Sequence, residues 1–126
     1  MPTAIVTGGA IRIGRAMALH LARKGFNIAL LYHSSGTANT IKEVRSHGVQ
    51  CQGYAGDLRN LEEAELFIGK ILKDFDDVEL LVNSAANFIQ ENVEQTQLES
   101  LVDTLNLNLI APYLLMREYK RKVNKG

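Results

Sequence analysis

The order of apolar runs and turn signals predicts an α/β fold, in which a parallel sheet is covered by helices on both faces. Short apolar runs alternate with amphipathic stretches along the chain, which is the pattern of repeated strand–helix units. Residues 26–32 are almost wholly apolar, as expected of a strand buried on both faces. Glycines stand between the first strand and the first helix and where helices are expected to end.

The first predicted strand and helix are joined by a glycine-rich turn. An apolar run at 4–6 ends at Thr7, and glycines follow at positions 8, 9 and 14. A helix is expected from Ile13 to Lys24, where large apolar side chains recur at helical spacing: Ile13, Met17 and Leu21. Dinucleotide-binding folds place a pyrophosphate at such a helix N-terminus. A turn that needs positive φ and binds nothing gives the same pattern, so these residues alone leave both interpretations open.

The middle of the chain continues the alternation. Further strands are expected at 26–32, 49–54 and 78–82, and a second helix at 37–47. The third helix follows Asn60, which with Glu63 has the spacing of an N-terminal cap.

The last helix is expected to be long. Thr96 and Glu99 have the spacing of a capping box at its start. Pro112 is expected to kink or split it, because proline interrupts the hydrogen-bond ladder. Four leucines are predicted to face inward along it: Leu98, Leu101, Leu105 and Leu109.

Composition limits the classes of protein that fit. The 126 residues, 46% hydrophobic and 22% charged, fit one modest globular domain. No apolar run is long enough for a membrane span, and no signal peptide is visible. The lone Cys51 excludes an internal disulfide and makes a zinc site unexpected. A cytoplasmic location is therefore expected. The basic end of the chain is predicted to be a solvated helix end rather than a nucleic-acid surface.

Polar residues follow the second and third predicted strands, at the edge where open α/β sheets bind ligands. His33, Ser34 and Ser35 stand where NAD-preferring folds place an acid for the ribose 2′-hydroxyl. With no acid there, and with Arg12 nearby, these residues favour the 2′-phosphate of NADP(H) over NAD(H); a polar turn that caps a helix is the alternative. Asp57 is either a helix-entry carboxylate or an acceptor for the adenine edge.

Together with residues 83–86 after the fourth strand, these residues resemble the short-chain dehydrogenase/reductase family. Its pattern is T-G-x-x-x-G-x-G, an Asp after the third strand, N-N-A-G after the fourth and an Asn in the next helix. The matching residues are Thr7, Gly8, Gly14, Asp57, Asn83, Ala85 and Asn108. Arg12 replaces the middle glycine, as in the pteridine-reductase-like branch, and Phe88 stands where that branch has an aromatic residue.

The resemblance implies a Rossmann-like three-layer sandwich with strand order 3-2-1-4, and a role for each matched residue. Phe88 would stack on a flat substrate, or it fills a gap in the core. Asn108 would hold a proton-relay water. The cofactor-binding residues would be Gly8, Gly9, Arg12, Ile13 and Gly14 for the pyrophosphate, His33, Ser34 and Ser35 for the adenosine phosphate, Asp57 and Leu58 for the adenine, and Asn83, Ser84, Ala85 and Ala86 for the nicotinamide ribose.

The catalytic Ser and Tyr-x-x-x-Lys of the family are missing from these 126 residues. The residues four positions after the four tyrosines are Gly36, Leu58, Arg117 and Val123. We therefore expect residues 1–126 to be a single, incomplete NAD(P)-binding domain of an NADPH-dependent carbonyl or pterin reductase, inactive alone. A non-catalytic nucleotide-binding or dimerisation module is the alternative. An apolar fourth strand at the sheet edge, or the long final helix, is expected to mediate homo-oligomer formation.

Overall fold

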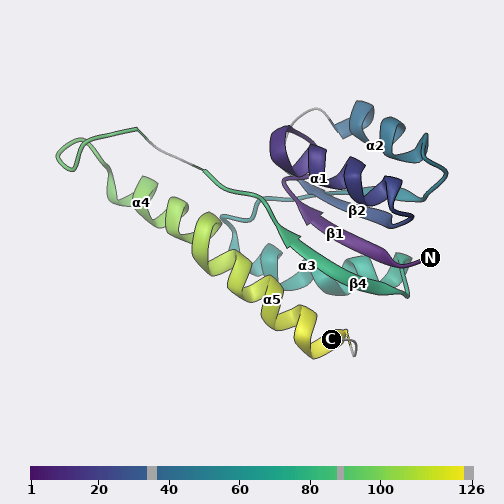
Figure 1. The fold of residues 1–126 in the computed structure, drawn as a ribbon. Helices are drawn as coiled ribbons and strands as arrows, with labels where there is room; N and C mark the ends of the chain where they lie inside the picture. The colour runs from purple at the N-terminus through teal and green to yellow at the C-terminus, as the bar shows by residue number, and fades with distance from the viewer. Residues whose placement is uncertain (34–36, 88–89, 124–126) are drawn as a thin grey trace.

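A four-stranded parallel sheet in the order β3-β2-β1-β4 forms the centre of the part of the chain that the structure describes, as predicted (Figure 1). The computed structural model describes residues 1–33, 37–87 and 90–123. The strands are β1 (Thr3–Thr7), β2 (Asn27–Tyr32), β3 (Cys51–Ala55) and β4 (Val78–Asn83). The helices are α1 (Arg12–Arg23), α2 (Thr37–Arg45), α3 (Leu61–Asp74), α4 (Leu98–Leu105), the π-helical turn η1 (Asn106–Ile110) and α5 (Ala111–Lys122).

The register of the sheet brings the four strand ends to one edge. Thr7, the last residue of β1, pairs with Leu31 of β2 on one side and Asn83 of β4 on the other. Tyr32 of β2 in turn pairs with Ala55 of β3. Because all pairs are parallel, the segments that follow the strands lie together along this edge.

Side chains alternate between the two faces of the sheet, and each face has its own core. In β1, Ile5 belongs to the core formed with α3 and α5, whereas Ala4 and Val6 belong to the core formed with α1 and α2. Of the central strands, β1 is buried throughout and β2 in all but its last residue, which explains the nearly continuous apolar run at 26–32. Asn60 caps α3 as predicted: its side chain accepts from the N–H groups of Glu62 and Glu63, at 3.1 and 3.3 Å.

The buried face of α1 is made mostly of small residues. Gly14, Ala18 and Ala22, spaced four apart, are buried together with Leu19. Ile13 and Met17, two of the large apolar residues whose spacing predicted the helix, are 70% and 41% exposed. Small residues on the inner face let α1 lie close to the sheet. The spacing of the large apolar residues thus predicted the helix correctly but pointed to the wrong face as the buried one.

The prediction that four leucines of the last helix face inward is wrong. Leu98, Leu101, Leu105 and Leu109 are 74%, 46%, 45% and 63% exposed. Figure 1 shows α4 extending beyond the sheet, where the described residues place no second layer against it. The helix is amphipathic, as the pattern indicated, but the described residues leave its apolar side largely exposed.

The ends of this helix also differ from the prediction. The capping box is absent: α4 follows Gln97, which makes no side-chain cap, and Thr96 Oγ1 donates to Asn92 O at 2.9 Å. The interruption expected at Pro112 is present. The backbone passes through the π-helical turn η1 before Pro112 opens α5, where its missing N–H does least harm.

Candidate functional site

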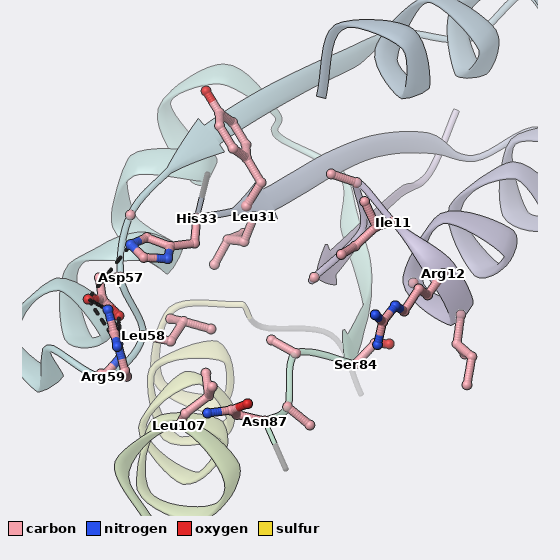
Figure 2. A pocket seen from close by; sticks show the side chains of 18 residues that line it. Ile11, Arg12, Leu31, His33, Asp57, Leu58, Arg59, Ser84, Asn87 and Leu107 are labelled. Carbon is pink, nitrogen blue, oxygen red and sulfur yellow. Dashed lines mark hydrogen bonds and ion pairs between the residues drawn. The ribbon is translucent and has the colours of Figure 1, made fainter. Parts of the chain in front are cut away.

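Residues that follow all four strands line one open cleft of about 450 Å³ at the carboxyl edge of the sheet (Figure 2). Most predicted site residues line it: Gly8, Arg12, Ile13, Gly14, His33, Asp57, Leu58, Ser84, Ala85 and Ala86. Gly9, Asn83 and Asn108 are not part of the lining. Ser34, Ser35 and Phe88 lie outside the described residues. The cleft therefore collects segments that are far apart in the sequence.

The glycine-rich turn is shaped by close backbone contacts. Gly8 has φ +62°, and a Cβ added there would lie 3.0 Å from Ala85 Cα. A Cβ on Gly14 would overlap the carbonyl oxygen of Gly8, and one on Gly9 would overlap the side chain of Leu30. Glycine is thus required at positions 8 and 14, whereas a side chain at position 9 would have to displace the buried Leu30 side chain, and the turn packs against the segment that follows β4.

The N-terminus of α1 opens into the cleft without a side-chain cap. Ile11 precedes the helix and makes no capping hydrogen bond, so the N-cap side chain satisfies none of the first N–H groups. Unpaired N–H groups and the helix dipole make such a terminus suited to an anion. Arg12, at the first helical position, adds a positive charge and lines the same cleft.

Arg12 also has unusual backbone geometry. Its φ of +53° lies in the left-handed region, and it is the only non-glycine residue with positive φ in the described chain. That conformation costs an L-residue about 1 kcal/mol relative to glycine. The family pattern that the sequence resembles has a glycine at this position, so the backbone keeps the glycine conformation although the side chain is arginine.

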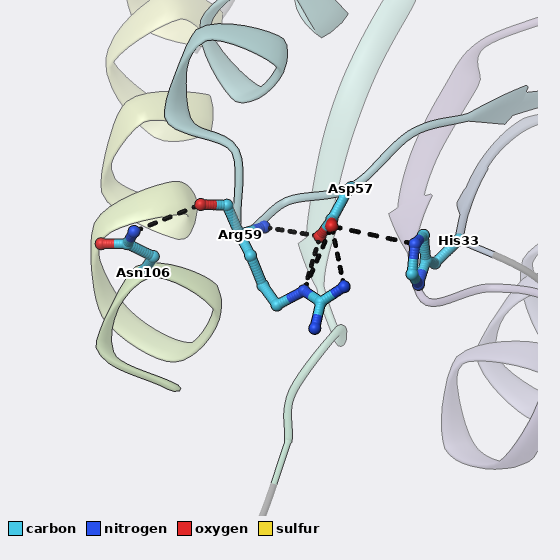
Figure 3. Close-up of polar contacts among 4 residues, drawn as sticks. All are labelled: His33, Asp57, Arg59 and Asn106. Atoms are coloured by element: carbon cyan, nitrogen blue, oxygen red, sulfur yellow. Dashed lines mark hydrogen bonds and ion pairs between the residues drawn. The ribbon is translucent and has the colours of Figure 1, made fainter. Parts of the chain in front are cut away.

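One carboxylate joins the segments that follow β2 and β3 (Figure 3). Asp57 accepts hydrogen bonds from Arg59, with Nε 2.9 Å from Oδ1 and Nη2 2.9 Å from Oδ2. His33 Nε2 lies 3.8 Å from the same Oδ2. The hydrogen bonds from Arg59 hold the pKa of Asp57 below its usual range, against the opposing effect of burial. Among the described lining residues Asp57 is the single acid, beside Arg12, Arg59 and His33.

Thr7 fixes the other end of the cleft. Its buried hydroxyl accepts hydrogen bonds from the N–H groups of Ser84 and Ala85, at 2.9 and 3.0 Å. This contact ties the end of β1 to the segment that leaves β4. Asn83, paired with Thr7 at the end of the ladder, lies just outside the cleft.

Two asparagines of η1 hold the loops on either side of the cleft. Asn108 Nδ2 donates to Asn87 O at 2.7 Å, and Asn108 Oδ1 accepts from Asn87 N at 2.8 Å. Asn106 Nδ2 donates to Arg59 O at 3.2 Å. Both polar groups of the Asn108 side chain therefore contact the backbone of Asn87. A role for Asn108 in holding a water stays a prediction.

The predicted site residues leave out eight residues of the cleft lining: Ala10, Ile11, Leu31, Tyr32, Gly56, Arg59, Asn87 and Leu107. A signal existed for Arg59, because a basic side chain two positions after a strand-end acid can fold back on it. Asn87 directly follows the matched motif at 83–86 and could have been included with it. Leu107 enters through the π-helical turn, whose register no periodicity in the sequence reveals.

Metal ligands and membrane-spanning helices were not found in the described part of the chain. Residues 1–33, 37–87 and 90–123 hold no group of His, Cys, Asp and Glu side chains that could bind a metal ion. None of the helices formed by these residues is long and apolar enough to cross a bilayer. Cys51 is a buried free thiol.

Comparison with known proteins gives a consistent picture. The model of the short chain dehydrogenase family matches residues 2–126. The uncharacterized oxidoreductase YhxC of Bacillus subtilis is 29% identical over 127 residues, which cover 98% of this chain and 45% of that protein. The chain spans less than half the length of the curated relatives it matches here, which include a 3-oxoacyl-[acyl-carrier-protein] reductase of Staphylococcus aureus, 29% identical over 108 residues.

Two solved structures with bound dinucleotides have the same fold. A blue fluorescent protein from a metagenomic library, in complex with NADPH, is 25% identical with a TM-score of 0.88, over 96% of this chain and 51% of that one. A 3-oxoacyl-[acyl-carrier protein] reductase of Brucella melitensis, in complex with NAD, is 28% identical with a TM-score of 0.86, over 95% of this chain and 48% of that one.

Proposed function

Because the chain belongs to the short-chain dehydrogenase family, we propose that its cleft binds a nicotinamide dinucleotide. It would be the nucleotide-binding part of an oxidoreductase that transfers hydride to a carbonyl or pterin-like substrate. The observation that carries the proposal is the uncapped N-terminus of α1, which lines one cleft together with the segments after β2, β3 and β4. With its pyrophosphate at that helix terminus, a dinucleotide would extend its two nucleoside ends in opposite directions along the edge of the sheet.

The pyrophosphate is proposed to lie on the turn between β1 and α1. Backbone N–H groups of Gly8 to Gly14 would hydrogen-bond its oxygens, and Arg12 would supply a countercharge. The close approach of Gly8, Gly9 and Gly14 to their neighbours supports this assignment, because side chains there would disrupt the turn that forms the cradle.

The adenosine is proposed to lie between His33 and Asp57, with Leu58 against the adenine. NADP(H) would be preferred to NAD(H), because the end of β2 carries no acid for a ribose 2′-hydroxyl, and His33 and Arg12 favour a phosphate. Ser34 and Ser35 would complete the phosphate site. Similar structures hold NADPH in one case and NAD in the other. The proposed preference for NADP(H) therefore depends on the residues of this chain and not on the fold.

The nicotinamide ribose is proposed to lie against residues 83–86, which Thr7 anchors. Phe88 would contact the substrate as in the pteridine-reductase-like branch, an assignment that rests on its position in the sequence and on Arg12. Cytoplasmic location, inferred from the single Cys51, likewise stays a prediction.

Turnover is not expected from these 126 residues alone. In the family that the sequence resembles, a Tyr-x-x-x-Lys pair gives a proton to the carbonyl that receives hydride, because the lysine lowers the tyrosine pKa. No tyrosine of this chain is followed four positions later by lysine. We therefore propose nucleotide binding as the activity of this chain, with catalysis requiring residues that it does not contain.

A binding or dimerisation module is the second candidate function. The exposed leucines of α4 and η1, together with the partly buried Leu80, Leu81 and Val82 of the edge strand β4, favour it. Such surfaces recruit partners. A homo-oligomer formed through either surface would satisfy this alternative without any nucleotide.

Calorimetric titration of the purified chain with NADPH and with NADH tests the proposal. We expect both to bind, and NADPH to bind more tightly. An assay of hydride transfer with the same sample should show no turnover. Binding of neither nucleotide would contradict the proposal, and sedimentation of the chain as an oligomer would then favour the second candidate.

A further inference from the structure

Arg59 lines the adenosine end of the cleft, two residues after Asp57, and matches no residue of the family pattern. Its guanidinium contacts both oxygens of Asp57, and His33 Nε2 lies 3.8 Å from Oδ2 of the same carboxylate. Figure 3 shows the imidazole and the guanidinium on this one group, each from a different strand end. Two basic side chains are thus already close enough to share a single anion.

The ion pair of Arg59 with Asp57 is exposed enough to exchange. The two side chains are 40% and 30% exposed, so water already solvates both partners and the pair contributes little to folding. A guanidinium binds phosphate oxygens with the same two-pronged geometry as a carboxylate. A phosphate monoester carries a charge of about −1.5 to −2 at neutral pH, so it attracts the guanidinium more strongly than Asp57 does.

We propose that Arg59 is a specificity-determining residue, which exchanges Asp57 for the 2′-phosphate of NADP(H) and binds it together with His33. The inference rests on the proposed function, because it requires the adenosine to lie at this end of the cleft. The exchange leaves Asp57 with free oxygens, and the proposed function uses these as acceptors for the adenine amino group. Each partner of the ion pair therefore gains a contact with the ligand.

The phosphate contact can be isolated with two small probes, 2′,5′-ADP and 5′-AMP, which differ in the 2′-phosphate. Calorimetry on the chain is expected to show that Arg59→Gln weakens binding of 2′,5′-ADP roughly tenfold and that of 5′-AMP by less than about twofold. Arg121→Gln is the matched control. It removes the same charge from an exposed arginine that pairs with Glu118 outside the cleft, and should change neither affinity.

A second variant distinguishes two roles of Arg59: binding the 2′-phosphate in place of Asp57, or only stabilising the loop through its ion pair with Asp57. Asp57→Asn breaks the same pair but leaves Arg59 free, so the ratio of the two affinities should stay the same or rise in favour of 2′,5′-ADP. If the pair only supported the loop, Arg59→Gln and Asp57→Asn would change the ratio equally, and that result would overturn the inference.

The two proposals fail in different ways. A wild-type chain that binds neither probe, nor NADPH nor NADH, contradicts the proposed function and this inference with it. A wild-type chain that binds 2′,5′-ADP more tightly than 5′-AMP, with the ratio unchanged by Arg59→Gln, contradicts the inference alone.

Discussion

Replacing one helical glycine by alanine should have opposite effects at two positions of this fold. Gly14, in the first turn of α1, has no room for a side chain, because a Cβ would overlap Gly8 O and lie 3.1 Å from Gly9 Cα. Both contacts are with backbone, which cannot move without opening the turn. Gly69, inside α3, would place a Cβ 3.2 Å from Lys122 Nζ, the flexible end of an exposed side chain.

The difference in stability follows from these contacts. Overpacking against rigid neighbours costs about 1–3 kcal/mol, so Gly14→Ala should lower the free energy of unfolding by about 2 kcal/mol. Gly69→Ala should raise it by roughly 0.5–1 kcal/mol, because alanine loses less backbone entropy in a helix. Urea unfolding followed by circular dichroism measures both. A Gly14→Ala variant as stable as Gly69→Ala would refute the close approach of α1 to the turn.

Three further predictions concern the cleft and the core. Arg12→Gly should be about 1 kcal/mol more stable than Arg12→Ala in urea unfolding, because only glycine accepts φ +53° without strain; equal stabilities would argue against that backbone. Thr7→Val should lose about 1–2 kcal/mol, because the N–H groups of Ser84 and Ala85 lose their acceptor, whereas Thr7→Ser keeps it; similar losses in both variants would contradict this. Burial raises the pKa of Cys51 to about 11 despite the nearby Arg45, so the folded chain at pH 8 should not react with Ellman's reagent until it is unfolded; reaction at the rate of a free thiol would contradict this.

The sheet and the location of the cleft could be predicted from the sequence, because they depend on local signals. The apolar run at 26–32 indicated a strand covered on both faces, and β2 is buried along almost its whole length. Asn60 indicated a helix start and caps α3. The carboxyl ends of parallel strands meet at one edge of the sheet. Because the strand order was predicted correctly, the segments after the strands were also expected to lie together.

Contacts that depend on distant partners could not be predicted. The leucine spacing of the last helix showed that one side is apolar, but not whether anything lies against that side, and Leu98 and Leu109 are exposed. The spacing of Thr96 and Glu99 fits a cap, but the preceding turn occupies the Thr96 hydroxyl. The approach of His33 Nε2 to within 3.8 Å of Asp57 Oδ2 depends on how the segments after β2 and β3 lie together, which periodicity does not fix.

The most direct test of the account is a map of where a dinucleotide contacts the chain. Titration of isotope-labelled protein with NADP⁺ should shift the backbone amide signals of residues 8–14, 33–35, 57–59 and 84–87 in NMR spectra. Residues 62–74, in α3, should stay unchanged and serve as the internal control. Shifts confined to these four segments are the result that the account predicts. No shifts at all, or shifts centred on α4 and α5, would contradict a dinucleotide site at the carboxyl edge of the sheet.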